Sequence, residues 1–483
     1  MHIESMSNQK LTPGYGILCQ PLTLSPTQAT PFHFTHCLIN GGGATVPHRH
    51  HESETFFLLE GEGTIKIGPE ERSIKGGDLV FIPPFELHQL INQSPEAPLR
   101  FLSTYAAQKP QPRLPQEAVV APAPPTPNGE LHLGHMAGPY LAADVLHRYL
   151  TMNEVSSRQI CGTDDHQPYV FSLAEKQGLG INQTIERFRS PIQSGLSSMN
   201  VELSHFLHPI ADADYKSFVQ SFFLKLVERK HLVLKKVPVP YCDHCQAIRT
   251  EDQISGQCTQ CQSPGSGNTC EECGYADESA KKLKASCGIC LKPTRNIEIE
   301  RFIFALGAYR MELEGYFSRI SLPQKLQTLI NSYLPNLYDF SVTLPRSGGI
   351  AVPVAGFEGH SIQVWFEMAA GYIYQLTKSN LRKPNFIPAF GIDNSFYYTT
   401  LIPALFMASN NLDALPSSFV FNEFYHLQGK KFSTSRRHAV WVNEIVAKIS
   451  SDTLRIFLSF QRPETSNTSF SFDRLSAYVS EIL

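Results

Sequence analysis

The sequence lacks long hydrophobic runs: none reaches the roughly eighteen consecutive apolar residues that a membrane-spanning helix needs. About thirty N-terminal residues are polar and contain no apolar segment of the kind that directs secretion. We therefore expect a cytoplasmic protein with no membrane partner. The chain also lacks an excess of charge of one sign, because 41 basic side chains stand against 44 acidic ones. That balance excludes broad attraction to nucleic acid, although it is compatible with a local basic groove.

Cysteine is plentiful, and its pattern is informative. Eight of the eleven cysteines form Cys-x-x-Cys pairs, namely Cys242/Cys245, Cys258/Cys261, Cys270/Cys273 and Cys287/Cys290. In a reducing compartment such pairs bind metal rather than form disulfides. Each pair offers two thiolates from one tight turn, and two pairs complete a tetrahedral zinc site. We therefore predict two closed structural Zn²⁺ sites in a loop-rich insertion at about residues 238–296.

The 483 residues suffice for about three domains. Residues 1–107 form the first candidate domain, in which apolar and polar residues alternate in short runs broken by glycine. This pattern predicts strands at 56–59, 64–67 and 78–82 and favours a compact antiparallel β-barrel. Residues 108–120 are rich in proline and predict a semi-rigid linker. Residues 121–483 form the second candidate domain.

Three histidines and one carboxylate of the first domain form a candidate metal site: His48, His50, Glu54 and His88. On a strand, His48 and His50 point to the same face, because the side-chain period is two. Such ligands suit several transition metals, and we expect one divalent ion there, with zinc the first choice. The alternative is a surface loop, since Arg49, His51 and Glu52 flank the pattern.

The second domain opens on residues 124–135, a proline-rich loop that ends in His-Leu-Gly-His and enters a helix-like run. His132 and His135 then lie at the first turn of a helix, where free N–H groups and the helix dipole favour a polyphosphate. Gly134 lets a nucleotide base approach the backbone, and Asn128 in the same loop is a further candidate contact. The motif is short, however, and surface histidines are common.

Further candidate substrate contacts follow two predicted strands. Residues 158–162 form an apolar strand, and Asp164 beyond its end is suited to bind an ammonium group, although such a residue also caps helices. Residues 363–367 are predicted as a strand whose Trp365 walls an apolar pocket, and Tyr372 follows it. Between these two stretches, residues 206–235 are predicted as helical.

Two later stretches have features of a nucleotide site. A glycine-marked strand end places Asp393 where it can meet a ribose hydroxyl. A basic loop at 428–437 then carries five candidate phosphate contacts, which are Lys430, Lys431, Ser433, Ser435 and Arg436. Taken alone, the loop reads as a solvated turn. A mobile loop of this composition can equally neutralise a pyrophosphate leaving group.

The first domain resembles the cupin family. The residues that match the first cupin motif are Gly42, His48, His50, Glu54 and Gly61, and those that match the second are Gly77, Pro83, His88 and Asn92. One departure is Phe85, which stands where the second motif usually has glycine. The resemblance implies a metal-binding cupin.

From about Ala121 onward, the chain resembles the catalytic core of methionyl-tRNA synthetase, a class I aminoacyl-tRNA synthetase. The matching stretches are 132–135, 431–435, the cysteine pairs, 364–367 with Gly371 and Tyr372, and Asp393. The implied fold class is multidomain, with an N-terminal all-β cupin barrel and an α/β Rossmann-type synthetase core that carries a zinc-knuckle insertion. In that family the knuckles nest, which pairs Cys258/Cys261 with Cys270/Cys273, and Cys242/Cys245 with Cys287/Cys290.

The departures from the synthetase are as important as the matches. The chain ends at Leu483, where that family continues into an anticodon-binding domain, so tRNA is not expected as a partner. The methionine pocket is altered by Thr126, Tyr398 and Met368, whereas Asp164 and Trp365 are kept. We therefore expect an α-amino acid other than methionine, with a small or polar side chain. In the loop signature Thr434 replaces a lysine, and we still expect adenylate formation.

This domain order resembles the cupin/methionyl-tRNA-synthetase didomain enzymes named hydrazine synthetases. The resemblance implies that ATP, with Mg²⁺, activates an amino acid, and that an N-hydroxylated amine such as N6-hydroxylysine captures the adenylate. The ester would then rearrange at the cupin metal into an N–N bond, and an N-hydroxylating monooxygenase would act upstream. Two alternatives remain: a synthetase paralogue that charges tRNA or another carrier, and a non-catalytic sensor of amino acids or metabolites.

Overall fold

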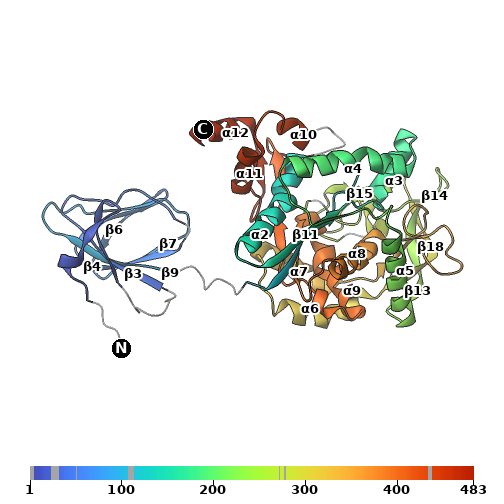
Figure 1. The fold of residues 1–483 in the computed structure, drawn as a ribbon, viewed down its shortest axis with the longest axis horizontal. Helices are drawn as coiled ribbons and strands as arrows, with labels where there is room; N and C mark the ends of the chain where they lie inside the picture. The colour runs from blue at the N-terminus through green and yellow to red at the C-terminus, as the bar shows by residue number, and fades with distance from the viewer. Residues whose placement is uncertain are drawn as a thin grey trace. The chain divides into compact units, whose positions relative to one another are not determined.

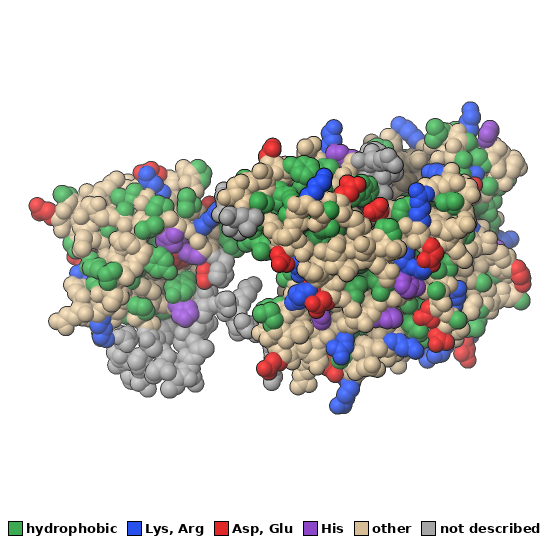
Figure 2. Space-filling model, turned by 45° about the horizontal axis from the view of Figure 1, so that its top comes forward, with side chains coloured by type: hydrophobic (Ala, Val, Ile, Leu, Met, Phe, Trp, Pro, Cys, Tyr) green, Lys and Arg blue, Asp and Glu red, His purple; other side chains and the backbone are tan. Residues whose placement is uncertain are grey.

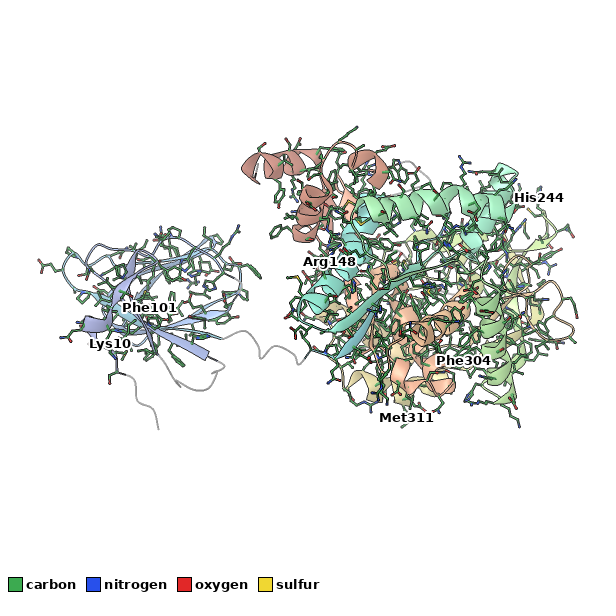
Figure 3. The ribbon with its side chains drawn as sticks, in the orientation of Figure 1. Lys10, Phe101, Arg148, His244, Phe304 and Met311 are labelled. Carbon is green, nitrogen blue, oxygen red and sulfur yellow. The ribbon has the colours of Figure 1, made fainter. Side chains whose placement is uncertain are left out.

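The computed structural model describes residues 5–22, 32–50, 52–106, 114–270, 272–276, 279–432 and 438–482. The chain divides into two compact units, residues 1–114 and 115–483. Each unit has its own hydrophobic core. Phe101 belongs to the core of the first unit and Phe304 to that of the second (Figure 3). The two units are described separately below.

The first unit consists of two β-sheets. The larger has the order β1 (Thr12–Gly14), β2 (Ile17–Leu22), β3 (Phe32–Ile39), β9 (Leu99–Ala106), β4 (Glu54–Glu60), β7 (Leu79–Ile82). The smaller has the order β6 (Glu70–Lys75), β5 (Glu62–Ile67), β8 (His88–Ile91). All the pairings are antiparallel, and residues such as Phe56, Leu58 and Leu90 fill the core. The predicted all-β architecture and its three predicted strands are confirmed.

The second unit contains a five-stranded parallel sheet. Its order is β12 (His205–Leu207), β11 (Ser156–Gly162), β10 (Glu117–Pro122), β22 (Asn385–Gly391), β23 (Val420–Asn422). From β10, the next strands β11 and β12 are added on one side of the sheet. From β22, the next strand β23 is added on the other side. The direction therefore reverses between β10 and β22, and ligands of such sheets bind beyond the carboxyl ends of the strands at that point. Because β10 begins at Glu117, the ordered core starts inside the expected linker, residues 108–120.

Helices surround this sheet (Figure 1). The first, α1 (Leu133–His135), passes through a π-turn at Met136–Tyr140 into α2 (Leu141–Met152). The others are α3 (Pro168–Gln177), α4 (Ile181–Ser198), α5 (Ala213–Glu228), α6 (Arg310–Phe317), α7 (Gln324–Tyr333), α8 (Val364–Lys378), α9 (Ile402–Ala408), α10 (Val442–Ile445), α11 (Ser451–Phe460) and α12 (Phe472–Ile482).

Two sequence predictions of secondary structure were wrong. Residues 363–367, predicted as a strand, form the N-terminus of α8, because the Gln363 side chain accepts hydrogen bonds from the Trp365 and Phe366 backbone N–H groups. This N-cap outweighs the strand preference of a Val-Trp-Phe run. Residues 206–235, predicted as helical throughout, contain α5 but begin in β12 and end in the next strand, β13.

The cysteine-rich insertion stands on a long antiparallel pair, β13 (Leu232–Cys242) and β18 (Arg295–Phe304). The short strands within it are β14 (Ala247–Ile248), β15 (Ile254–Gln257), β16 (Pro264–Ser266) and β17 (Leu283–Cys287). Those elsewhere in the second unit are β19 (Phe340–Ser341), β20 (Thr343–Leu344), β21 (Ser361–Ile362), β24 (Tyr425–Leu427), β25 (Lys430–Lys431) and β26 (Thr468–Phe470). In Figure 1, β13 and β18 lie at the opposite end of this unit from α11 and α12.

Surface charge and hydropathy fit the sequence composition. In the space-filling view, basic and acidic side chains are interspersed over the visible face of the second unit (Figure 2). In the described parts of the chain, every helix is too short or too polar to cross a bilayer.

Candidate active site and metal centres

The two signature histidines stabilise the helix start that presents them. The His135 backbone N–H donates to His132 Nδ1 at 3.2 Å, and the His132 N–H donates to His135 Nδ1 at 3.3 Å. Their rings stack with centroids 3.6 Å apart. Because each Nδ1 accepts a hydrogen bond, the proton of each neutral ring is on Nε2. The pair therefore offers two Nε2–H donors, which a phosphate oxygen accepts.

Burial keeps both imidazoles neutral. It lowers the pKa of His135 to about 4. It also lowers the pKa of His132 well below its usual value, with a further contribution from neighbouring His135. At neutral pH the rings therefore act as hydrogen-bond donors rather than as cations. The predicted position at the first turn of a helix is confirmed.

The strand β25 reaches this histidine pair. The Phe432 ring stacks on His132 at 4.8 Å, and a Cβ at Gly134 would lie 3.0 Å from both Phe432 and the His132 ring. Any larger residue at position 134 would therefore displace the His132 or Phe432 ring from this packing. Lys431 lies one residue before Phe432, and its Nζ is 3.9 Å from the centre of the Phe424 ring. Lys430 is the first residue of the same strand. The predicted contacts Ser433, Ser435 and Arg436 lie outside the described residues.

A small cleft opens beyond the ends of β10 and β11. It is lined by Pro122, Pro124, Ile160, Cys161, Gly162, Thr163, Asp164, Leu207, Pro209, Tyr215, Val364, Glu367, Met368, Gly371, Tyr372 and Gln375. Of the predicted substrate contacts, Asp164 and Tyr372 line it, and Tyr398 lies behind it. Trp365 stacks on Tyr397 instead, at 3.8 Å. Thr126 lies in the loop next to Pro125, whose carbonyl accepts from the Asp164 N–H at 3.0 Å.

Asp164 is buried, at 6% exposure. Burial raises the pKa of this carboxyl well above its usual value, and the nearby carboxylates Glu367, Asp165 and Glu251 raise it further, whereas Gln167 opposes them. A cation beside this carboxyl would therefore stabilise its charged form. An ammonium group of a substrate is such a cation.

A buried network behind Asp164 was not foreseen from the sequence. His166 Nδ1 lies 2.8 Å and 3.0 Å from the two carboxylate oxygens of Glu367, which also accepts from Tyr215 Oη at 3.1 Å. Burial opposes charge on His166, but Glu367 outweighs it and raises the His166 pKa. The network joins the loop after β11 to α5 and α8. The one signal of this network in the sequence was the polar Glu367 inside an apolar run. A prediction of helix for 363–367 would have placed Glu367 on the face that lines the cleft.

The remaining predicted nucleotide contacts lie at the sheet edge. Asp393 is the middle residue of the 3₁₀ turn Ile392–Asn394 directly after β22, as predicted for a strand end. A Cβ at Gly391 would lie 2.9 Å from Asp393 Oδ1, so glycine leaves room for this carboxylate. Asn128 lies in the loop after β10, where its N–H donates to the Thr126 carbonyl at 2.8 Å. The switch point of the sheet thus brings the two loops to the same edge.

In the first unit, the candidate ligands come together. One ligand atom from each of His48, His50, Glu54 and His88 lies within 4.8 Å of the others. Each histidine also directs Nδ1 at a backbone carbonyl: His48 at Val46 (2.7 Å), His50 at Glu52 (3.1 Å) and His88 at Glu86 (2.9 Å). A carbonyl can only accept, so each Nδ1 donates to it, and Nε2 is the ring atom that remains to bind a metal. This donor set fits a divalent ion.

The carboxylate of this cluster is held ionised. Burial opposes the charge on Glu54, but hydrogen bonds from His88, Ser103 and His50 outweigh it and hold the Glu54 pKa below its usual value. A carboxylate beside three imidazole groups is a ligand set that suits Zn²⁺ and its neighbours in the transition series.

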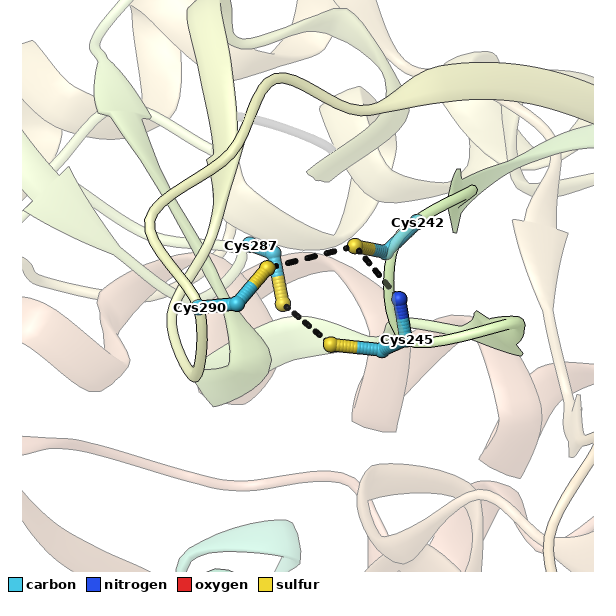
Figure 4. Close-up of side chains that lie close together, drawn as sticks. All are labelled: Cys242, Cys245, Cys287 and Cys290. Carbon is cyan, nitrogen blue, oxygen red and sulfur yellow. Dashed lines mark hydrogen bonds between the residues drawn. The ribbon is translucent and has the colours of Figure 1, made fainter.

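The eight paired cysteines form two separate clusters. Cys242, Cys245, Cys287 and Cys290 point toward one another from two knuckles (Figure 4), and Cys258, Cys261, Cys270 and Cys273 form the second group. Sulfur pairs across the knuckles are 3.5–3.9 Å apart. Four sulfurs around zinc at about 2.3 Å would be roughly 3.8 Å apart, so both clusters have the dimensions of a tetrahedral site. The nested pairing expected from the resemblance is confirmed.

Comparisons with known proteins agree with this architecture. A family model described as tRNA synthetases class I (M) matches residues 118–483. The chain belongs to that family. A Cupin domain model matches residues 35–105, within the first unit. The second unit is therefore the synthetase core, and the first is the cupin domain.

Similar curated proteins are methionine–tRNA ligases. That of Dehalococcoides mccartyi is 29% identical over 364 residues, which cover 72% of this chain and 66% of the relative. That of Methanocaldococcus jannaschii is 28% identical over 356 residues, or 72% of this chain and 54% of the relative. The chain thus spans between half and two thirds of their length.

Solved structures show the same fold. Mycobacterium tuberculosis methionyl-tRNA synthetase in complex with methionyl-adenylate has a TM-score of 0.60 at 19% identity, covering 76% of this chain and 68% of that chain. A second structure of the same enzyme with methionyl-adenylate has a TM-score of 0.61. The synthetase core thus has the class I fold expected from the sequence.

Proposed function

We propose that the synthetase core activates an amino acid with ATP. An oxygen of the amino-acid carboxylate attacks the α-phosphorus, the bond from that phosphorus to the bridging oxygen breaks, and pyrophosphate leaves with Mg²⁺. The observation that carries this proposal is the histidine pair with both Nε2–H donors fixed at the switch point of the sheet. Family membership supports it independently.

In this proposal, each site residue has a role that follows from its charge and hydrogen-bonding groups. His132 and His135 donate to oxygens of the reacting phosphates, and Lys430, Lys431 and the loop after them neutralise the pyrophosphate. Asp393 binds the ribose, with Asn128 and Gly134 next to the nucleotide. Asp164 binds the α-ammonium group, which orients the carboxylate toward ATP. Each contact places a reactant or stabilises charge that grows in the transition state.

We further propose that the acceptor is an N-hydroxylated amine such as N6-hydroxylysine. Its hydroxyl oxygen attacks the acyl carbon of the adenylate, and AMP leaves. In the resulting ester, the α-amine of the activated residue attacks the hydroxylamine nitrogen, the N–O bond breaks, and its electron pair leaves on the carboxylate. The new bond joins two nitrogens without an external oxidant. The domain order and the resemblance to hydrazine synthetases support this second stage. An upstream N-hydroxylating monooxygenase would supply the N-hydroxylated amine.

The metal clusters have different roles in this proposal. The eight cysteines hold two structural Zn²⁺ ions that replace a hydrophobic core in the insertion. His48, His50, Glu54 and His88 would hold a divalent ion, zinc first, which when bound would supply a Lewis acid for the ester carbonyl.

The test is ATP–pyrophosphate exchange across the twenty amino acids, repeated with N6-hydroxylysine and mass detection. We expect exchange with at least one amino acid and a condensed product with an N–N bond. A His48→Ala protein should keep the exchange and accumulate the ester. Exchange without condensation would contradict the second stage, and charging of total tRNA would then test the carrier alternative that the relatives suggest. No exchange at all would favour the sensor.

A further inference from the structure

We propose that the cleft beside Asp164 admits only amino acids whose side chain has at most two heavy atoms, that is, glycine, alanine, serine and cysteine. This inference rests on the proposed activation of an amino acid and names its substrate class. It makes Met368, Tyr372 and Tyr398 the residues that determine specificity.

The volume of the cleft sets the limit. The cleft holds about 30 Å³ of water-accessible space. One water-sized group needs about 10–15 Å³ in this measure, so the cleft accommodates about two to three such groups. The α-ammonium group occupies the first position, next to Asp164. One or two positions then remain for the heavy atoms of the side chain, which excludes a thioether, a branched chain or a ring.

One wall of the cleft is fixed from behind by Tyr398. This side chain is 1% exposed, and its ring stacks on Phe390 with centroids 4.4 Å apart. Its hydroxyl lies 2.5 Å from Tyr372 Oη and 3.6 Å from Met368 Sδ. Both of those side chains line the cleft. Because stacking and a hydrogen bond hold Tyr398, neither Tyr372 nor Met368 can retreat into the space that it fills.

The opposite walls approach at glycines. A Cβ at Gly371 would lie 2.9 Å from Tyr215 Oη, and a Cβ at Gly162 would lie 2.7 Å from the Leu207 carbonyl oxygen. Elements α5, α8, β11 and the end of β12 thus meet here without space for one more methyl group. At Gly162 the neighbouring atom belongs to the Leu207 backbone, so a change of side-chain rotamer cannot move that wall of the cleft.

The lining also favours a small polar substrate. Gln375 lies one helical turn after Gly371 on the same face of α8, and it is buried. Its Oε1 has no hydrogen-bond partner among the residues that the structure describes. An ammonium or hydroxymethyl group would supply a donor, whereas a long apolar side chain would leave this acceptor unpaired.

The first test compares kcat/KM for pyrophosphate exchange across the amino acids with the unaltered full chain. We expect glycine, alanine, serine or cysteine to exceed methionine by at least about 100-fold, since each excess heavy atom must displace a fixed wall. Methionine or any larger amino acid within about ten-fold of the best substrate would overturn the inference while leaving the proposed activation intact.

The second test enlarges the cleft. Met368→Ala should raise the ratio of kcat/KM for methionine to that for glycine at least about ten-fold. Met199→Ala is the matched control: the same truncation at a fully buried methionine of the separate cluster around α2 and α11, where the ratio should stay unchanged. Equal ratios in both variants would overturn the role of Met368.

A third measurement separates the two proposals. If no amino acid supports exchange, the proposed activation fails. Thermal shift of the unaltered chain with glycine, serine or methionine then tests the size limit of the cleft independently of activation. Stabilisation by glycine or serine alone would support the size limit, and stabilisation by methionine, or by none of the three, would contradict it.

Discussion

At the scale of single residues, the synthetase core combines groups that stabilise its fold with groups that destabilise it. His132 and His135 cap the helix that carries them, so their chemistry and their structural role coincide. Asp164 is the opposite case, a buried carboxyl whose pKa is raised by burial and by neighbouring carboxylates. The sequence predicted both histidines and the aspartate at strand and helix ends. It could not predict the tautomers, which depend on contacts between backbone and side chains.

Replacing His135 by asparagine should separate its two roles. Asparagine keeps an acceptor near the position of Nδ1 and loses the Nε2–H donor. We therefore expect an unchanged Tm and a fall in the exchange kcat by a factor of about 10²–10³. His147→Asn on α2 is the control, because that histidine pairs with Ser157 rather than with a phosphate site. A kcat for His135→Asn within about three-fold of the unaltered protein would contradict the donor role.

Replacing Asp164 by asparagine should raise stability and abolish activation. Folding raises the pKa of this carboxyl above its ordinary 3.8, so the folded protein holds a proton that the unfolded chain has released. Stability is therefore lost as pH rises above the unfolded pKa. We expect the Tm gain of the variant to be larger at pH 8 than at pH 5, with each kcal/mol worth about 2–4 °C. Calorimetry of the variant and the unaltered protein at both pH values measures this gain. A Tm gain at pH 8 that is equal to or smaller than the gain at pH 5 would contradict the prediction.

At the scale of elements, the main error of the sequence analysis was instructive. Residues 363–367 have strand-forming side chains, yet Gln363 caps them into α8, and the helical period directs Glu367 and Met368 into the cleft. Propensity is local, whereas the cap and the burial of the helix depend on tertiary packing. The cysteine clusters were predictable because Cys-x-x-Cys spacing fixes the local turn, and the resemblance supplied the nested order.

Zinc content should report each cysteine cluster separately. We expect two Zn²⁺ ions from the insertion, in addition to the cupin metal, by elemental mass spectrometry. Cys258→Ala should lower the content by one ion, because a closed site that loses a thiolate binds zinc far less tightly. Cys161→Ala removes a buried cysteine that belongs to neither cluster and should leave the content unchanged. Unchanged zinc in Cys258→Ala would contradict the assignment.

At the scale of the whole molecule, the chain joins two units with separate hydrophobic cores. The cupin domain is a β-structure whose core contains Phe56, Leu58 and Phe101, and the synthetase core is organised around a parallel sheet. Alternating apolar and polar residues predicted the β-structure of the cupin domain. The order of the motifs predicted the synthetase core. The position of β10 was missed by a few residues, because its start lies in a proline-rich stretch that reads as linker.

Calorimetry should resolve separate unfolding transitions for the two units. We expect His48→Ala, which alters only the cupin domain, to shift one transition and leave the other within about 1 °C. The amino-acid substrate should shift only the other, because ligand binding stabilises the unit that contains its site. A single cooperative transition that responds to both changes would contradict separate folding.

The reciprocal hydrogen bonds of His132 and His135 also affect how this sequence can change over generations. A mutation at either codon that removes the acceptor atom weakens the helix start and removes a phosphate donor at once, so selection for folding alone acts against most changes of either histidine. Asp164 is under the opposite pressure, since its loss stabilises the fold. A descendant that no longer needs catalysis would therefore keep the histidines and lose the aspartate first. Among related genes, the aspartate rather than the better-known signature would mark those that still work.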